Sequence, residues 1–280
     1  MSFICVNNGY YNTKIITQDN KQHCFRTAIQ KSLTEYDKNV VELNGERYIV
    51  GSGKHDLKLD KSTSKVQEAC VKYAMERYGQ QGGKPVDTIV SAIPIDVYLQ
   101  PEARKAYEDL LNKYAKDVKI TMETKIATVN NRDYYKGKTV ILVDIGGLTA
   151  NSMVLVDGRL EEGTAISTQC GTLIFNQALK KHIEQTQLVK VTDAEIDIED
   201  ISNYPQIVEN HIELLKEEFR KQGYPNRSTV HHRFIGGGAL KFKSFLEKSF
   251  PNCFIPEDAE WENAKGIYTI ARNLANKNKI

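Results

Sequence analysis

A glycine turn near the amino end of the chain combines backbone N–H groups with a lysine. The apolar run Phe3–Val6 ends in two asparagines and Gly9, and Lys14 follows in the next apolar run. A tight glycine turn between two strands exposes backbone N–H groups that can bind an anion. Lys14 can reach the same anion as a point charge. Because most Asn-Gly turns only join two strands, this turn indicates a phosphate site only together with other signals.

A second glycine turn follows an apolar run near the middle of the chain. Its sequence is Asp144-Ile145-Gly146-Gly147-Leu148-Thr149-Ala150-Asn151. The paired glycines allow the backbone to approach a phosphate closely, and Thr149 can donate to a phosphate oxygen. Asp144 ends the expected strand and can hold Mg²⁺ through water, because Mg²⁺ keeps most of its hydration shell. The alternative is a glycine-rich hairpin without a ligand.

A third glycine segment joins an expected strand to an expected helix. Gly236, Gly237 and Gly238 follow the apolar run Val230–Ile235 and precede Ala239. The start of a helix favours negative charge, and bare backbone there lets a purine or its ribose lie against the chain. A tight turn needs only one or two glycines, so three in a row indicate more than a turn.

Other groups that resemble chemical sites have simpler explanations. Gly51-Ser52-Gly53-Lys54 lacks the first glycine and the hydroxyl residue of a P-loop. His231 and His232 are neighbours on a strand and point to opposite faces, which argues against a metal site. The 5 cysteines include no CxxC pair, so we expect reduced thiols rather than a zinc site or disulfides.

Composition excludes several classes of protein. The 280 residues carry a formal net charge of +2, with 40% hydrophobic and 26% charged residues. This balance gives no general attraction to nucleic acid or membrane, although it permits self-association. The amino end lacks the features of a signal peptide, and the longest apolar runs have the length of strands. We therefore expect a cytoplasmic protein with neither direct DNA binding nor a membrane segment.

The expected elements indicate a mixed α/β protein with two halves. A strand, a glycine turn and a second strand occur twice, at Phe3–Thr17 and Val140–Val156. Further strands and helices follow each hairpin, which predicts two α/β lobes facing one another across a cleft. The expected helices are 64–78, 101–114, 171–184, 205–222, 239–249 and 258–276.

Taken in order, the three glycine segments resemble the superfamily of actin, heat-shock chaperones and sugar kinases. Within it the chain is most similar to ParM-type plasmid-segregation actins, with Asp144–Thr149 close to their second phosphate hairpin and Ile235–Ala239 to their adenosine turn. Weaker likenesses are found at 44–51, at 91–94 and at 122–127, where the family carries its water-positioning carboxylate.

The resemblance implies an actin-like (ribonuclease H-like) α/β fold of two lobes, with nucleotide in the interlobe cleft and a reduced second lobe. The first lobe would be 1–143 with 258–280, and the second 144–257, shortened between His182 and Pro205. Ala264 and Gly266 would form the second connection between the lobes.

The resemblance also implies the site. Lys14, Glu123 and Asp144 would be catalytic, with Glu123 orienting the attacking water and Asp144 holding the magnesium shell. The implied nucleotide-binding residues are Asn7, Gly9, Tyr10, Lys14, Gly146, Gly147, Leu148, Thr149, Lys216, Glu217, Gly236, Gly237, Gly238 and Ala239. The chain departs from the family at Asn7 and Asn151, where Asp is usual. Because Asn lacks the charge of Asp, Mg²⁺ would rest mainly on Asp144 and the phosphates.

The function that this resemblance implies is ATP- or GTP-dependent, Mg²⁺-dependent assembly into head-to-tail filaments. In the family an adaptor protein on centromere-like plasmid DNA caps the filament, so contact with DNA would be indirect. Two alternatives stay open: a small-molecule kinase of the same fold, and a nucleotide-binding scaffold that does not polymerise.

Overall fold

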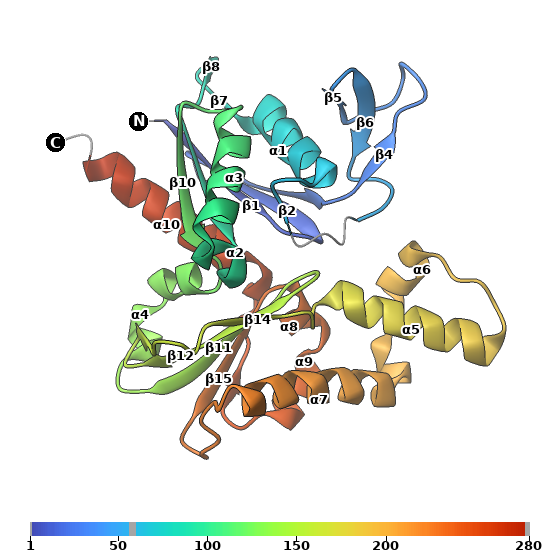
Figure 1. Ribbon diagram of the computed structural model, residues 1–280, viewed down its shortest axis with the longest axis vertical. Helices are drawn as coiled ribbons and strands as arrows, with labels where there is room; N and C mark the ends of the chain where they lie inside the picture. Colours follow the sequence, from blue (N-terminus) through green and yellow to red (C-terminus); the bar gives the residue numbers. More distant parts are fainter. Residues whose placement is uncertain (1, 56–59, 278–280) are drawn as a thin grey trace. The chain divides into compact units, whose positions relative to one another are not determined.

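The computed structural model describes residues 2–55 and 60–277, and its contacts divide the chain into two compact units (Figure 1). Unit 1 comprises Met1–Arg132 and Trp261–Ile280, and unit 2 comprises Asp133–Glu260. The division expected from the sequence, between 143 and 144, falls inside a strand that spans Thr139–Ile145. The structure keeps this strand whole in unit 2, because it pairs along its full length with the next strand.

The large sheet of unit 1 has the order β10-β9-β1-β2-β3. Its strands are β1 Phe3–Asn8, β2 Asn12–Thr17, β3 Gln22–Arg26, β9 Thr88–Ile93 and β10 Asp117–Met122. β1 is antiparallel to β2 and parallel to β9, and β9 is parallel to β10. All residues of β1 and β9 are buried, as expected for strands covered on both faces.

Helices cover both faces of this sheet. Ile4 and Val6 pack with α1 (Lys65–Tyr78) and α3 (Pro101–Asn112). Phe3 and Cys5, which point the other way along the same strand, pack with α10 (Glu262–Lys277). The short α2 (Ile95–Leu99) precedes α3, whose first residue is proline, a residue suited to the first helical turn.

A smaller sheet of unit 1 packs against α1. It contains β4 Ile29–Lys31, β5 Val40–Leu43 and β6 Glu46–Val50. Asn44 and Gly45 join β5 to β6 with φ values of 52° and 78°. Left-handed backbone at both positions is what a two-residue hairpin turn requires. A short ribbon of β7 (Gln80–Gln81) and β8 (Lys84–Pro85) follows α1.

The sheet of unit 2 repeats the pattern of the large sheet of unit 1. Its order is β13-β12-β11-β15-β16, with β14 also paired to β12. The strands are β11 Thr139–Ile145, β12 Ala150–Val156, β13 Arg159–Leu160, β14 Ile166–Thr168, β15 His231–Ile235 and β16 Cys253–Phe254. As in unit 1, the first strand of a hairpin has its antiparallel partner on one side and a parallel strand on the other.

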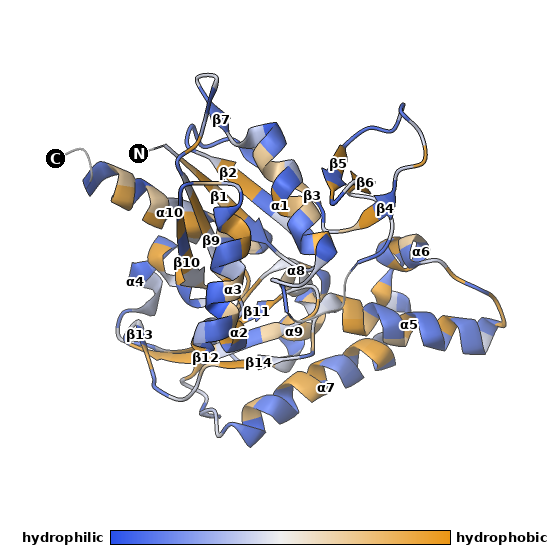
Figure 2. Ribbon diagram, turned by 45° about the horizontal axis from the view of Figure 1, so that its top comes forward, coloured by the Kyte–Doolittle hydropathy of each residue, from blue (hydrophilic) through white to orange (hydrophobic). Residues whose placement is uncertain are grey.

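Long helices of unit 2 bury their apolar residues in one core with β11. α5 (Thr172–Gln187) and α7 (Pro205–Lys221) lie side by side (Figure 1). Along the chain, α6 (Asp193–Ile198) and the 3₁₀ turn η2 (Ile201–Asn203) lie between these two helices. Figure 2 shows hydrophobic and hydrophilic residues alternating along α7, as in a helix with one buried face.

Two expected helices differ from those observed. The single helix expected at 239–249 is two, α8 (Gly237–Lys241) and α9 (Lys243–Ser249). Phe242 separates them with non-helical backbone, and its fully buried side chain anchors the break in the core. The last helix begins at Glu262 rather than Asp258, after the 3₁₀ turn η3 (Ala259–Trp261). None of the described helices is long and apolar enough to cross a membrane.

Candidate functional site

The first glycine turn joins β1 to β2 in unit 1. β1 continues through Asn7 and Asn8, so the turn is shorter than the sequence indicated. The Gly9 N–H donates to the Asn7 carbonyl at 3.1 Å. A Cβ on Gly9 would lie 2.7 Å from the carbonyl oxygen of Asn12, so only glycine fits the turn. Tyr10, at the tip, is buried.

Asn7 and Lys14 face each other across this hairpin. Both are largely buried, and Asn7 Oδ1 has no hydrogen-bond partner within the described chain. Lys14 Nζ lies 5.9 Å from the centre of the Trp261 ring. Asn8 points to the opposite face and accepts a hydrogen bond from Thr13 at 2.7 Å, which gives it a structural role. Asn8 therefore stabilises the hairpin, whereas the side-chain oxygen of Asn7 remains available to a ligand.

Glu123 lies at the same edge of this sheet. β1, β9 and β10 are parallel, so their carboxyl ends share an edge, and Glu123 directly follows β10. Its Oε1 accepts from Lys61 Nζ at 3.0 Å, and both side chains are buried. Burial raises the pKa of Glu123, while the charge and hydrogen bond of Lys61 act in the opposite direction.

Two more groups complete the polar cluster of unit 1. Asp96, at the start of α2, has a buried Oδ1 without a hydrogen-bond partner in the part of the chain that the structure describes. Lys61 Nζ lies 5.0 Å from the centre of the Tyr10 ring. Burial raises the pKa of Tyr10, and the charges of Glu123 and Asp96 add to this. Lys61 and Asp96 were not predicted from the sequence, because neither belongs to a recognisable motif.

An unusual backbone turn fixes the position of Glu123. Thr124 has φ 67° and ψ −58°, and the Lys125 N–H donates to the Glu123 carbonyl at 2.7 Å. This is a γ-turn with positive φ, a strained conformation for a β-branched residue. The Thr124 N–H donates to Asn263 Oδ1 of α10 at 3.0 Å. A Cβ on Gly266 would lie 2.3 Å from the Ile126 carbonyl, so this glycine lets α10 approach the turn.

The second glycine turn, in unit 2, joins β11 to β12 and is fastened to the start of α5. The Gly146 N–H donates to the Thr149 carbonyl at 2.9 Å. The carbonyls of Gly146 and Gly147 accept from the N–H groups of Thr172 and Leu173 at 3.0 and 2.7 Å. Leu148, between them, is buried. The support from α5 was not predicted, although Gly171 before this helix was a signal: its Cβ would lie 2.3 Å from the Gly147 carbonyl.

Polar side chains gather beside this turn. Asp144 and Asn151 pair across the hairpin, and both are buried together with Thr149. Asn151 Nδ2 lies 3.4 Å from Thr149 Oγ1, while Asn151 Oδ1 finds no hydrogen-bond partner in residues 2–55 or 60–277. The hairpin of unit 2 therefore carries an unsatisfied asparagine oxygen, as the hairpin of unit 1 does at Asn7.

The three consecutive glycines begin directly beside Asp144. A Cβ on Gly236, where φ is 88°, would lie 2.4 Å from Asp144 Oδ1. A Cβ on Gly238 would lie 2.3 Å from the Ile145 side chain, whereas one on Gly237 would meet nothing within 4 Å. Ala239 is fully buried in the core. The structure thus brings the second and third glycine segments together around Asp144.

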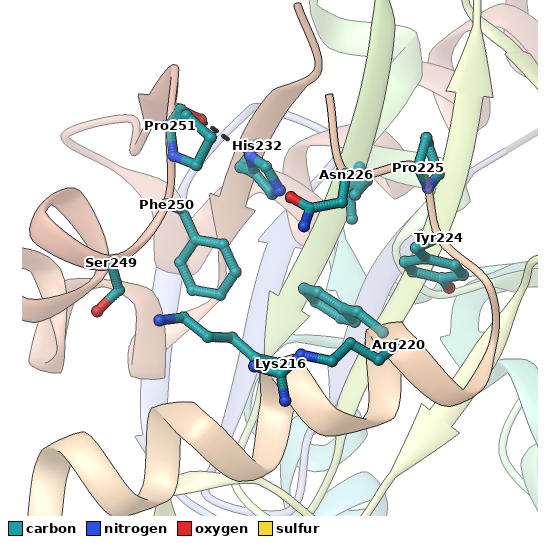
Figure 3. Close-up of a pocket in the computed structure, with 11 residues that line it drawn as sticks. Lys216, Arg220, Tyr224, Pro225, Asn226, His232, Ser249, Phe250 and Pro251 are labelled. Atoms are coloured by element: carbon teal, nitrogen blue, oxygen red, sulfur yellow. Dashed lines mark hydrogen bonds between the residues drawn. The ribbon is translucent and has the colours of Figure 1, made fainter. Parts of the chain in front are cut away.

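The structure does not bring Lys216 and Glu217 to these glycines, so their predicted contact with the nucleotide is corrected. Lys216 lines a cavity of ≈ 250 Å³ with Phe219, His232 and Phe250 (Figure 3). His232 pairs with Ile141 near the first residues of both strands. Gly236 follows the other end of β15, roughly 13 Å along the strand. Glu217 is exposed on α7. Helical periodicity could not show which end of the sheet this part of α7 reaches.

The residues of each unit, taken by itself, suit groups of a nucleotide or of its magnesium ion. In each unit the unsatisfied asparagine oxygen is an acceptor, and it suits a water molecule such as those that Mg²⁺ keeps around it. Among the described residues, no group of three or more His, Cys, Asp or Glu side chains is placed to hold a metal ion. Asp144 would therefore hold Mg²⁺ together with phosphate oxygens, the usual arrangement for this ion.

Part of the chain matches a known family. Residues 6–135 match the family described as the N-terminal domain of actin-like proteins. This segment contains the turn of the first hairpin, Lys61, Asp96 and Glu123. A comparison with curated proteins finds no match.

Several solved structures are similar over nearly the whole chain. The archaeal actin homolog Ta0583 in complex with ADP has a TM-score of 0.80 and 18% identity, covering 98% of this chain and 100% of its own. A 15-stranded ParM filament from Clostridium botulinum has a TM-score of 0.77 and 16% identity, covering 97% and 99%. MreB 5 of Spiroplasma citri bound to AMPPNP has a TM-score of 0.74 and 16% identity, covering 98% of both chains. These similarities confirm the fold predicted from the glycine segments.

Proposed function

We propose, from the premise that this chain has the actin-like fold, that it is a nucleotide-dependent, filament-forming ATPase that hydrolyses ATP or GTP. One observation carries the proposal: each unit places a glycine hairpin beside a buried, unsatisfied asparagine oxygen at the end of an equivalent sheet. Two of the similar structures contain ADP or AMPPNP, which supports a nucleotide as the ligand.

Each unit, taken by itself, carries groups suited to part of a nucleotide. In unit 1, the turn at Gly9 and Tyr10 and the Lys14 ammonium bind phosphate, and Asn7 accepts from water. In unit 2, backbone N–H groups from Gly147 to Thr149 and the Thr149 hydroxyl would bind phosphate, and Asp144 would hold Mg²⁺. Gly237 offers bare backbone for the nucleoside, because nothing in the described chain lies within 4 Å of its missing side chain. Bound Mg²⁺ would neutralise phosphate charge during hydrolysis.

Glu123 orients the attacking water. It lies at the same edge of the sheet as Lys14, within electrostatic range of it. A carboxylate can accept the hydrogen bond of a water and so point its oxygen at a phosphorus atom. The strained turn at Thr124 supports this role, because strain of this kind is retained mainly where a side chain must be held in one place.

Filament formation is proposed from the similar structures rather than from the site. Two similar structures are filaments, the ParM filament and the Alp12 filament. We propose head-to-tail self-assembly in the cytoplasm that serves plasmid segregation. An adaptor protein on centromere-like DNA would join the filament to its cargo, which agrees with a net charge of only +2.

Asp96 favours a second candidate function, a small-molecule kinase of the same fold. A kinase needs a base that accepts the proton of a substrate hydroxyl. The buried and unsatisfied Asp96 Oδ1, in the same polar cluster as Glu123, is suited to that task. A polymerising ATPase does not require it.

Right-angle light scattering after addition of ATP or GTP with Mg²⁺ tests the proposal, together with release of phosphate. We expect a rise in scattering above a critical concentration, and no rise with nucleoside diphosphate. Asp144→Ala should abolish it, whereas Asp133→Ala should not, because Asp133 is an exposed acid of the same unit. A flat trace from wild-type protein that binds nucleotide would exclude the filament and direct the search to phosphoacceptor substrates.

A further inference from the structure

Lys61 is among the largest fully buried side chains of the described chain. It belongs to the segment that leads into α1, and only 1% of its side chain is exposed. Lysine is almost never buried to this extent unless it is paired. Its ammonium pairs with Glu123 Oε1 at 3.0 Å and lies over the ring of Tyr10. Lys61 therefore joins the tip of the first hairpin to the carboxylate at the end of β10.

Stability alone does not explain such a pair. Removing two charges from water costs so much that well-packed apolar residues in their place are often as stable or more stable. The presence of Lys61 at this position therefore calls for another explanation. Its partner is the carboxylate to which the proposed function assigns the attacking water, and the inference below rests on that function.

Lys61 bonds to one of the two oxygens of Glu123. Its Nζ donates to Oε1 at 3.0 Å. The main chain that follows Glu123 is fixed by the turn at Thr124 and by the hydrogen bond to Asn263. We propose that Lys61 is a positioning residue: by holding Oε1, it orients Oε2 of Glu123 toward the water that attacks the terminal phosphate.

Lys61 also keeps the carboxylate charged. The groups that face Glu123 are Lys61 before α1, Tyr10 in the first glycine turn, Lys14 on β2, Asp96 on α2 and Tyr107 on α3. Burial raises the pKa of Glu123, Asp96 raises it further, and Lys61 is the largest influence that lowers it. Without Lys61, the pKa of Glu123 rises further, and less carboxylate is present at neutral pH.

The first test needs no nucleotide. The unfolding free energy is measured against pH for wild type, Glu123→Gln, Lys61→Met and the double variant. The pKa of Glu123 is higher in the folded chain than in the unfolded chain. The stability that Glu123 contributes, relative to Gln, therefore falls as the pH rises from the unfolded-state pKa to the folded-state pKa. We expect this fall to continue to higher pH in the Lys61→Met background. The same pH dependence in both backgrounds would overturn the proposal.

If Lys61→Met does not fold at neutral pH, the double variant with Glu123→Gln decides. That variant carries neither charge, so a proposal based on pairing predicts that it folds where the single variant does not. Equal loss of folding in both would show that the Lys61 side chain serves packing alone, and would refute the pairing role.

The second test uses phosphate release by the full chain. Lys61→Met should lower kcat about tenfold or more at pH 7, with little change in KM. In a plot of kcat against pH, the acid limb should shift to higher pH. Lys61→Arg, which keeps the charge, should retain the wild-type limb. A rise in KM at unchanged kcat would make Lys61 a phosphate ligand instead and would overturn its role through Glu123.

The two hypotheses fail separately. Wild-type protein that neither binds nor hydrolyses nucleotide would refute the proposed function. In that case the unfolding measurements still decide whether Lys61 sets the charge of Glu123. A wild-type enzyme that hydrolyses ATP while Lys61→Met keeps its kcat and acid limb would refute only the role of Lys61.

Discussion

Gly236, Gly237 and Gly238 differ in the reason why each is glycine. At Gly236 a side chain would collide with Asp144 and the backbone has positive φ, and at Gly238 it would collide with Ile145. The protein's own packing thus explains two of the three. Gly237 has ordinary φ and open space around its missing Cβ, as far as the described residues extend. Its lack of a side chain is consistent with space reserved for a ligand.

Gly237→Ala and Gly236→Ala form a matched pair that tests this difference. Gly237→Ala should change the unfolding free energy by less than about 1 kcal/mol, because alanine suits the start of a helix. It should weaken binding of a fluorescent nucleotide. Gly236→Ala should destabilise the fold by roughly 2–4 kcal/mol through strain and collision. Unchanged nucleotide affinity in a folded Gly237→Ala variant would show that the nucleoside lies elsewhere.

The glycines of the site could be predicted from the sequence, but several of its charged residues could not. Glycine turns between apolar runs are local patterns, and so Gly9, Gly146 and Gly236 could be found. Lys61 and Asp96 lie far along the chain from Glu123, and no local pattern marks them. Only the parallel order of β1, β9 and β10 brings the carboxyl ends of these strands, and the residues near them, to one edge of the sheet. The position of Lys216 was predicted wrongly because it too depends on the tertiary arrangement and not on a local pattern.

At the scale of elements, the two hairpins were the best-predicted feature. Each is a pair of apolar runs around a turn with glycine, and each recurs in the same position of its sheet. The break at Phe242 could not be predicted, since Ala239–Ser249 has good helical periodicity. It arises from burial of Phe242 in a core that residues distant in sequence complete. Packing thus overrides local propensity there.

The turn after β10 gives a prediction at this scale. Thr124→Gly should be more stable than Thr124→Ala by roughly 1–2 kcal/mol, because glycine adopts positive φ without the strain that a Cβ causes. Chemical denaturation of both variants measures the difference. The opposite order would mean that the backbone at Thr124 is not left-handed and that Glu123 is held in another way.

The packing of α7 against the segment before α5 predicts a dependence on pH. His211 is buried on α7, and its Nε2–H donates to the Cys170 carbonyl at 3.0 Å. Burial lowers the pKa of His211 below its ordinary value of 6.5. The unfolded chain therefore binds this proton more readily, and the stability contributed by neutral His211 is lost as pH falls from above 6.5 through the folded pKa.

Unfolding by urea at pH 7.5 and pH 5.5 measures this effect. Wild type should lose stability over that interval, and His211→Phe, which cannot titrate, should lose less. His232, whose pKa burial also lowers, will retain part of the dependence in the variant. An equal loss in wild type and variant would show that His211 is not titrating in this range.

For the molecule as a whole, short-range contacts must decide whether copies associate. The 38 basic and 36 acidic residues nearly balance, so long-range repulsion between copies is small. A nucleotide can control such association only by binding the assembling conformation more tightly than the other. In the proposed mechanism, Lys14 loses a partner when the terminal phosphate leaves, which supplies that difference.

Filaments formed with ATP should therefore be shorter-lived than filaments formed with a non-hydrolysable analogue such as AMPPNP. After a limited amount of ATP, scattering should rise and then fall as phosphate accumulates, whereas with AMPPNP it should stay high. Loss of the terminal phosphate removes the preference for the assembling state. Fresh ATP supplies a new terminal phosphate and should therefore restore the scattering signal. That recovery separates disassembly from aggregation. Filaments that persist after complete hydrolysis would show that the γ-phosphate does not control the polymer.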